Sequence, residues 1–239
     1  VIAGGMESMT NAPQLLFKQR FGQKMGDSML IDSMIYDGLW DVYNDMHMGN
    51  TGEVVSEEFD VSRQQMDEFA ARSQRLATEA ESNGWFDWER FAIEIPQRRG
   101  DPLIFNVDEG VRAGTTADGL ANLRPVFKQN GRVTAGNSST LNDGASAILV
   151  AEYQTALDNG WEIIATIEDY CTSGLEPERV MAAPIPAINT LLKRNKLEVL
   201  DVDVYEHNEA FAAASCAVAK EVGIPEDRFN LHGGAVSLG

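Results

Sequence analysis

The chain has 239 residues, 44% of them hydrophobic, which is enough for one large domain or two small ones around a packed core. Its 37 acidic and 19 basic residues give a formal net charge of −18, which argues against a nucleic-acid-binding protein and against attachment to an anionic membrane surface. No run approaches the length of a membrane span. The two cysteines, Cys171 and Cys216, match no metal-binding or redox spacing, and we expect Cys216 to be a buried structural thiol.

The first residues, VIAGGMESMT, read as the end of a buried strand, because an apolar run breaks into the pair Gly4-Gly5. The chain opens without an initiator methionine or a targeting segment, in what reads as the middle of that strand. We therefore expect a polypeptide truncated at both ends.

A long helix from Arg63 to Ser82 is the clearest element of the first half. Ser62 and Gln65 form a capping-box pattern at its start, and Gly84 follows its end. One face of this helix is apolar and is expected to pack, through Met66, Phe69, Ala70, Leu76, Ala77 and Ala80. A short strand is expected from Ala92 to Ile95.

Strands and helices alternate in the remainder, which is typical of α/β layering. The run ASAILVA, from Ala145 to Ala151, predicts a strand covered on both faces. A short helix to Gly160 follows it. The later elements are a strand at Ile163–Tyr170, a helix at Ala187–Lys196, a strand at Val202–Tyr205 and an alanine-rich helix that ends at Gly223.

Two polar features near the end of the chain have both a structural and a functional interpretation. Asn208 lies at a strand-to-helix junction, where its amide could cap the helix or point into a cleft. The pair Gly233-Gly234, with Gly239, predicts either an ordinary turn or a close-approach loop whose N–H groups face a developing oxyanion.

Together these features closely resemble the thiolase family, in its biosynthetic acetyl-CoA acetyltransferase branch. The resemblance rests on Asn-Glu-Ala-Phe-Ala from Asn208 and on Asn-x-x-Gly-Gly-Ala-x-x-x-Gly from Asn230. Ala-Gly-Gly-Met-Glu-Ser-Met from Ala3 and Ala-Gly-Asn-Ser-Ser-x-x-Asn-Asp-Gly-Ala from Ala135 are similar to further thiolase motifs.

The resemblance implies an α/β fold, the layered α-β-α-β-α architecture of thiolases, present in part and with a large insertion. Residues 1–10 and 142–160 would be a remnant of the N-terminal core, 11–141 an inserted loop domain that covers coenzyme A, and 161–239 the first part of the C-terminal core.

The resemblance also implies a Claisen condensation of two acetyl-CoA to acetoacetyl-CoA and CoA, or the reverse thiolysis, through a cysteine acyl-enzyme. Asn208 matches the asparagine that holds an oxyanion-hole water. The nucleophilic cysteine, the catalytic histidine and the base cysteine would lie outside this sequence, so the polypeptide alone is expected to be inactive. The coenzyme A thioester is the substrate, and no cofactor or metal is expected.

Several residues match positions that contact the substrate in thiolases. His47, with Met48, would line the pantetheine and acyl pocket of the biosynthetic branch, although a lone histidine is also typical of a surface or structural residue. Arg112 would meet the nucleotide end of coenzyme A, or be a solvated loop arginine. The other predicted substrate contacts are Leu39, Phe127, Ala135, Ser139, Met181, Ala210 and Phe211.

This sequence departs from the family pattern at several positions. Gly52 stands where alanine is more common, and Ala182-Ala183 replaces a glycine-rich string, which either narrows the pocket or is neutral. His207 and His232 replace alanine and asparagine, and we expect both to be structural, hydrogen-bonded histidines.

Two other functions remain open at this point: a non-catalytic acyl-CoA-binding member of the superfamily, and a degradative 3-ketoacyl-CoA thiolase, which His47 argues against. The resemblance further implies a cytoplasmic homodimer or homotetramer that binds neither nucleic acid nor membranes. If strands of both core halves are missing, apolar strand edges should be exposed.

Overall fold

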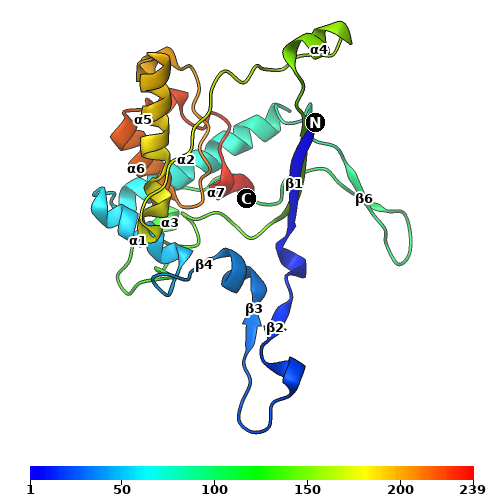
Figure 1. Cartoon of the computed structure of the whole chain (residues 1–239), viewed down its shortest axis with the longest axis vertical. Helices are drawn as coiled ribbons and strands as arrows, with labels where there is room; N and C mark the ends of the chain where they lie inside the picture. The colour runs from blue at the N-terminus through cyan, green and yellow to red at the C-terminus, as the bar shows by residue number, and fades with distance from the viewer.

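The computed structural model describes residues 1–239 and consists of a helical body from which pairs of strands project (Figure 1). The strands are β1 (Ile2–Ser8), β2 (Gln14–Leu16), β3 (Leu30–Asp32), β4 (Trp40–Asp41), β5 (Met46–His47), β6 (Ile93–Ile95), β7 (Leu103–Phe105) and β8 (Asp143–Leu149). They form four antiparallel pairs, β1 with β8, β2 with β3, β4 with β5 and β6 with β7.

Seven α-helices complete the secondary structure, with short 3₁₀ or π turns between them. They are α1 (Met48–Glu58), α2 (Arg63–Ser82), α3 (Ala117–Ala121), α4 (Tyr153–Asp158), α5 (Pro184–Asn195), α6 (Ala212–Val222) and α7 (Ala235–Leu238). None of them combines the length and the apolar character that crossing a membrane requires.

Helix α2 confirms the prediction from the capping box. The Ser62 hydroxyl accepts a hydrogen bond from the Gln65 N–H at 3.2 Å, and the Gln65 side chain accepts one from the Ser62 N–H at 2.7 Å. Met66, Ala70, Ala77 and Ala80 of its apolar face are fully buried, while Phe69 and Leu76 are half-buried. The same helix also buries three polar side chains that the pattern did not single out: Asp67, Ser73 and Gln74.

Two apolar clusters form the core. The larger lies where α1 and α2 pack on α6, so the middle and the end of the chain share one core. It consists of Val55, Val61, Met66, Val133, Ala182, Phe211, Ala212, Ala213 and Ala217. The smaller lies between α5 and α6 and consists of Leu192, Val218, Val222, Ile224 and Phe229.

The β1–β8 pair confirms two predicted strands but not their burial. Ile2 pairs with Leu149 and Ser8 with Asp143, in a continuous antiparallel ladder. Yet every residue of β8 is exposed, and so is most of β1. A continuous apolar run is typical of a strand between two covering layers, but in this chain no helix or further strand packs on the faces of the pair.

Two other predicted strands are absent. Ile163–Tyr170 is irregular throughout, and Val202–Tyr205 contributes only one bridge, from Tyr205 to Phe229. A strand needs a neighbouring strand for its backbone hydrogen bonds, and none lies beside Ile163–Tyr170 in this chain. The predicted helix Ala187–Lys196 forms but begins earlier, at Pro184, since proline is well suited to the first turn of a helix.

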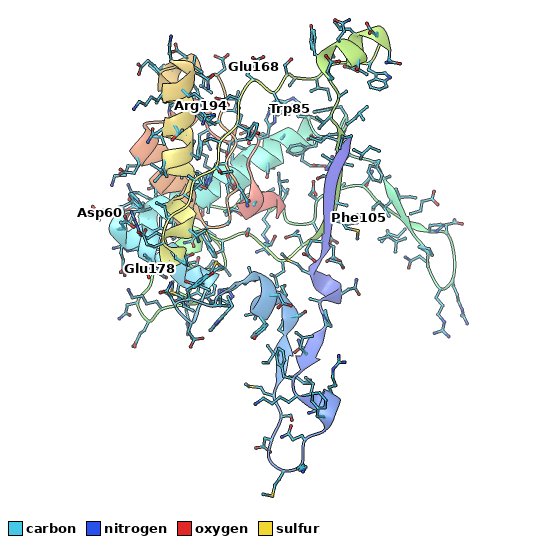
Figure 2. The ribbon with its side chains drawn as sticks, in the orientation of Figure 1. Asp60, Trp85, Phe105, Glu168, Glu178 and Arg194 are labelled. Atoms are coloured by element: carbon cyan, nitrogen blue, oxygen red, sulfur yellow. The ribbon has the colours of Figure 1, made fainter.

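Two arms of paired strands extend from the helical body, as Figure 1 shows for β2–β3 and β6–β7. In the β6–β7 arm Ile93 pairs with Phe105, and Ile95 pairs with Leu103, so these four apolar side chains share one face. Phe105 is 37% exposed and lies on this arm, away from the helices (Figure 2).

Candidate active site

An aromatic cluster centred on Phe127 brings together residues from three distant parts of the chain. The imidazole of His47 stacks on the Phe127 ring, with centroids 4.7 Å apart and planes 25° apart. Phe211 meets the same ring edge to face, at 6.3 Å and 90°. Met48 packs beside them on the large core cluster, and its N–H donates to the carbonyl of Leu39 at 2.8 Å.

His47 has a structural task as well. It is the N-cap of α1, and its Nδ1 accepts a hydrogen bond from the Gly49 N–H at 2.9 Å. Accepting at Nδ1 requires that nitrogen to carry no proton. Burial lowers the pKa of His47, which also favours the neutral ring. The predicted structural role of His47 is therefore confirmed, as a half-buried helix cap, and its place in a substrate pocket stays a prediction.

Two glycines allow α1 to approach these rings. A Cβ at Gly49 would lie 2.2 Å from the Phe127 ring, so no side chain fits there. At Gly52 a Cβ would lie 3.3 Å from both Phe211 and Val133, a tight distance that requires only a small adjustment. The departure from alanine at Gly52 therefore avoids a tight approach of α1 to Phe211 and Val133.

The loop from Thr134 to Ser139 is tied to α2 on one side and to α6 on the other. Asn137 donates to Asp67 of α2 at 2.8 Å, and its side-chain oxygen accepts from the Thr134 N–H at 2.8 Å. The Ser139 N–H donates to the carbonyl of Ala210 at 3.0 Å. This arrangement brings Ser139 and Ala210 together, as expected for two parts of one site.

Met181 and Ala210 also pack against the large cluster that contains Phe211. Ala182 lies inside this cluster and is 1% exposed, because the turn Pro177–Ala182 packs on α1 and α6. The Ala182 methyl group therefore serves the core, while its neighbour Ala183 is half-buried.

Arg112 lies apart from the aromatic cluster. It lines a cavity of about 150 Å³ together with Ala135, Gln74 and Val236. Gln74 holds this segment, because its Oε1 accepts from the Arg112 N–H at 2.7 Å. The Arg112 guanidinium is exposed and makes no hydrogen bond or ion pair within the chain. The predicted substrate contacts thus fall into two groups, around Phe127 and around Arg112, and Ala135 belongs to the second.

Asn208 is exposed, and its side chain has no hydrogen bond. The cap interpretation is wrong, because α6 begins four residues later, at Ala212, with Phe211 as its N-cap. The delay arises because residues 207–210 hold long-range bonds instead: His207 to Asn230, and Ala210 to Ser139. The Asn208 amide is therefore free to bind a group from outside the chain.

The predicted close approach at Gly233-Gly234 is confirmed, but its backbone N–H groups are occupied. A Cβ at Gly233 would lie 2.6 Å from the Ser73 carbonyl, and one at Gly234 would lie 2.4 Å from the Glu209 carboxyl carbon. Gly233 donates to the Asn230 carbonyl, Gly234 to the Ser73 hydroxyl, and Gly239 to the Ala235 carbonyl. In this structure the segment is a packed turn and presents none of these donors to an oxyanion.

The remaining histidine and cysteine predictions hold only in part. His207 is a hydrogen-bonded structural residue, since its Nδ1 lies 3.0 Å from the Ser215 hydroxyl, and burial lowers its pKa to about 4. His232 is exposed and forms no hydrogen bond, but its ring lies against Trp85 (labelled in Figure 2), just after α2, with centroids 4.9 Å apart and planes tilted by 40°. Cys216 is half-buried on the core, and burial raises its pKa to about 12, so this thiol is unreactive.

Both halves of the chain match models of known protein domains. The model of the N-terminal domain of thiolase matches residues 1–154, and the model of the C-terminal domain matches residues 161–239. The chain belongs to the thiolase family. It is 50% identical over 239 residues to a probable acetyl-CoA acyltransferase of Staphylococcus epidermidis and 46% identical to one of Staphylococcus aureus. It spans 61% of the length of each of these curated relatives.

Solved thiolase structures superpose on the whole chain. The acetyl-CoA acetyltransferase of Bacillus anthracis does so with a TM-score of 0.94 at 38% identity, and human mitochondrial 3-ketoacyl-CoA thiolase with 0.94 at 36% identity. The match covers 100% of this chain and 60% of each of theirs. The predicted thiolase fold, present in part, is confirmed. The division of this thiolase chain at residues 10, 141 and 160 and the roles of its site residues remain predictions.

The sequence patterns did not single out three buried residues next to the candidate site. Glu209, Ser73 and Asn230 form a hydrogen-bonded group that includes the chain neighbour of Asn208 and contacts the Gly234 N–H. The sequence signal for this group is Glu209 itself, a charged residue that stands between Asn208 and a run of apolar residues.

Proposed function

We propose that the complete protein that contains this chain is an acetyl-CoA C-acetyltransferase. It would condense two acetyl-CoA molecules to acetoacetyl-CoA and CoA, or run the reverse thiolysis, through a cysteine acyl-enzyme. Cys171 is half-buried, with its thiol donating a hydrogen bond to the Ala187 carbonyl, and Cys216 is unreactive, so neither serves as the nucleophile. The nucleophile, the catalytic histidine and the base would be contributed by regions outside this chain, and no cofactor would be needed besides the thioester substrate.

One observation carries the proposal: the substrate positions inferred from thiolase motifs converge in space. Leu39, His47, Met48, Phe127, Met181, Ala210 and Phe211 come from separate segments, yet they form or adjoin a single aromatic and apolar cluster. Such a surface suits the apolar parts of pantetheine and a small acyl group. The free guanidinium of Arg112, near Ala135, suits the phosphates at the other end of coenzyme A.

Asn208 would act at the reacting end. Its unpaired amide can hold a water molecule that donates a hydrogen bond to the enolate oxygen of the thioester. A neutral amide suits this task, because it orients the water without adding a titrating charge. In the proposed condensation, the α-carbon of the second acetyl-CoA loses a proton to the base and attacks the acyl-enzyme carbonyl, and the enzyme thiolate leaves.

A longer-chain 3-ketoacyl-CoA thiolase is the second candidate. It is favoured by the superposition on the human mitochondrial 3-ketoacyl-CoA thiolase, which is as good as that on the bacterial acetyltransferase. The stacked pair His47–Phe127 favours the acetyl enzyme, because a half-buried imidazole on the ring occupies space that a long acyl chain would need.

The test is thiolysis of acetoacetyl-CoA by the protein expressed from the complete open reading frame, beside Asn208→Ala. We expect turnover in the parent and a loss of kcat in the variant of about 100-fold or more, the usual effect of losing one oxyanion-stabilising group. A parallel assay with 3-ketooctanoyl-CoA separates the two candidates. A folded parent that binds CoA but turns over neither substrate would exclude both and favour an acyl-CoA-binding protein.

A further inference from the structure

We propose that Glu209 and Asn230 are positioning residues for Asn208, and that they couple the Asn208 corner to the Gly233–Gly239 segment. The inference rests on the proposed function, because it assigns the residues that fix where the Asn208 amide points. Neither residue would touch the substrate. Both would act by holding the backbone on either side of Asn208.

Asn230 clamps the residue before Asn208. Its Nδ2 donates to the His207 carbonyl at 2.9 Å, and its Oδ1 accepts from the His207 N–H at 2.7 Å. Asn230 is 0% exposed and has a φ of 47°, in the left-handed region that asparagine tolerates better than most residues. Its side chain thus takes the place of a neighbouring strand and satisfies both backbone groups of His207.

Glu209 clamps the residue after Asn208. Its Oε1 accepts from Asn230 Nδ2 at 2.8 Å, and its Oε2 accepts from the Ser73 hydroxyl at 2.6 Å and from the Val236 N–H at 3.1 Å. These donors belong to three different segments: the turn before α7, α2, and α7 itself. Through Glu209 the Asn208 corner is therefore fixed to the helix that follows Gly233-Gly234.

The burial of Glu209 indicates a task other than stability. Its side chain is 0% exposed and forms no ion pair with any cationic residue of the chain. Burying a carboxylate opposes folding, and apolar residues of similar size often stabilise a protein more than buried charges do. The three donors to the Glu209 carboxylate offset that cost only if they are held in place. Holding them in place also fixes the position of the neighbouring Asn208.

Asn208 itself contrasts with its neighbours. His207, Glu209 and Ala210 all hold bonds to other segments, whereas the Asn208 side chain is exposed and has no partner. The bonds fix the direction of the Asn208 Cα–Cβ bond without restricting the amide. This is the geometry expected of a residue whose partner arrives with the substrate.

The experiment is a double-mutant cycle in the complete protein with Glu209→Gln, Asn208→Ala and the pair. The glutamine keeps the shape of the side chain but replaces one acceptor oxygen by a donor, so at least one bond beneath Asn208 is lost. We expect kcat for acetoacetyl-CoA thiolysis to fall about 10- to 100-fold with KM little changed, since a displacement near 1 Å has effects of this size. In the Asn208→Ala background the same change should cost almost nothing further.

Glu53→Gln is the matched control. Glu53 is 3% exposed and accepts hydrogen bonds from the backbone N–H groups of Arg132 and Val133 at 2.8 Å, so the variant also loses a buried carboxylate. Each variant is assayed below its own melting transition. We expect Glu53→Gln to lower the melting temperature and leave kcat unchanged. Equal effects of Glu209→Gln in both backgrounds, or full kcat in folded Glu209→Gln, would overturn the proposal.

A crystal structure of the Glu209→Gln protein is a second readout that needs no turnover. We expect the Asn208 Cβ to move by at least about 0.5 Å relative to the core, the tolerance of a well-held site. An unmoved Asn208 would overturn the positioning role even if the parent is an active thiolase. If the parent shows no turnover but Asn208 moves in the Glu209→Gln structure, the positioning role is supported and the proposed function fails.

Discussion

The ring of His47 lies over the ring of Phe127, and the Phe127 ring occupies space that would be filled by any side chain at Gly49. This contact joins the first turn of α1 to the segment that precedes the Thr134–Ser139 loop. The stacking of the two rings depends on Gly49, which contacts no substrate in the proposed function.

Gly49→Ala should therefore destabilise the protein. Because the new Cβ would lie 2.2 Å from Phe127, the ring must leave its stack, and we expect a loss of about 1–3 kcal/mol in the free energy of unfolding by urea. Adding Phe127→Leu should cost less than the sum of the two single changes. Gly174→Ala, where no heavy atom lies within 4 Å, is the control and should change stability little.

Substitutions at two other glycines distinguish the cost of backbone strain from the cost of crowding. Gly233 and Gly160 have φ values of 82° and 65°, but only Gly233 is crowded, by the Ser73 carbonyl at 2.6 Å. We expect Gly160→Ala to cost about 1–2 kcal/mol, the usual strain of a left-handed residue, and Gly233→Ala to cost at least about 1 kcal/mol more. Equal shifts in the urea midpoint would contradict the close approach of α2 to this turn.

Loss of the Ser62 cap should destabilise α2 without affecting catalysis. Ser62→Ala removes the acceptor for the Gln65 N–H, and such a change costs about 1 kcal/mol. The measurement is thermal unfolding followed by circular dichroism. Ser82→Ala, at the other end of the helix, serves as the control, because that exposed hydroxyl only donates to the Thr78 carbonyl. In the complete protein, the proposed thiolysis should have an unchanged KM when Ser62→Ala is introduced.

His207 should make the protein less stable in mild acid. Burial lowers its pKa from 6.5 to about 4, so the folded state keeps the ring neutral where the unfolded chain already binds a proton. The stabilisation from the neutral ring is complete above pH 6.5, decreases as the pH falls, and is lost below about pH 4. A shift of this size corresponds to about 3 kcal/mol.

The measurement is the free energy of unfolding between pH 7 and pH 4, for the parent and for His207→Gln. The variant should be less stable at pH 7 but show a flatter dependence in this range. A parent slope that survives His207→Gln would assign the effect to other groups.

Arg112→Ala should raise the KM for acetoacetyl-CoA about tenfold if the guanidinium meets a phosphate of the substrate. Its side chain makes no bond within the chain, so the melting temperature should not change. Arg124→Ala removes another exposed arginine without an internal partner and should leave KM unchanged. Similar increases in KM for both variants would indicate general electrostatic attraction only.

Local signals in the sequence predicted α2, α4, α5 and α6 but not α1, α3 and α7. The box of Ser62 and Gln65 marked the start of α2, and Gly223 marked the end of α6, where its φ is 81°. These signals work because caps and glycines act within one turn of the chain. Family motifs predicted the thiolase fold and indicated the positions that meet around Phe127.

Features that depend on distant partners could not be predicted. The apolar run at Ala145 gave the strand but not its exposure, which depends on what covers its faces. The sequence places Asn208 just before a helical run, which predicts a helix cap. In the structure the helix begins later, because Asn230 and Ser139 form hydrogen bonds with His207 and Ala210. The hydrogen-bonded group of Glu209 joins residues far apart in sequence, and no periodicity records such a contact.

The shared core of α1, α2 and α6 has a consequence for synthesis on the ribosome. The apolar face of α2 leaves the exit tunnel long before Ala212 to Val222 exist to cover it. At typical elongation rates of about 5–20 residues per second, that interval is on the order of ten seconds. During this time Met66 and Phe69 lack the cluster that they share with α6, so the nascent chain should be a substrate for chaperones that bind exposed amphipathic helices.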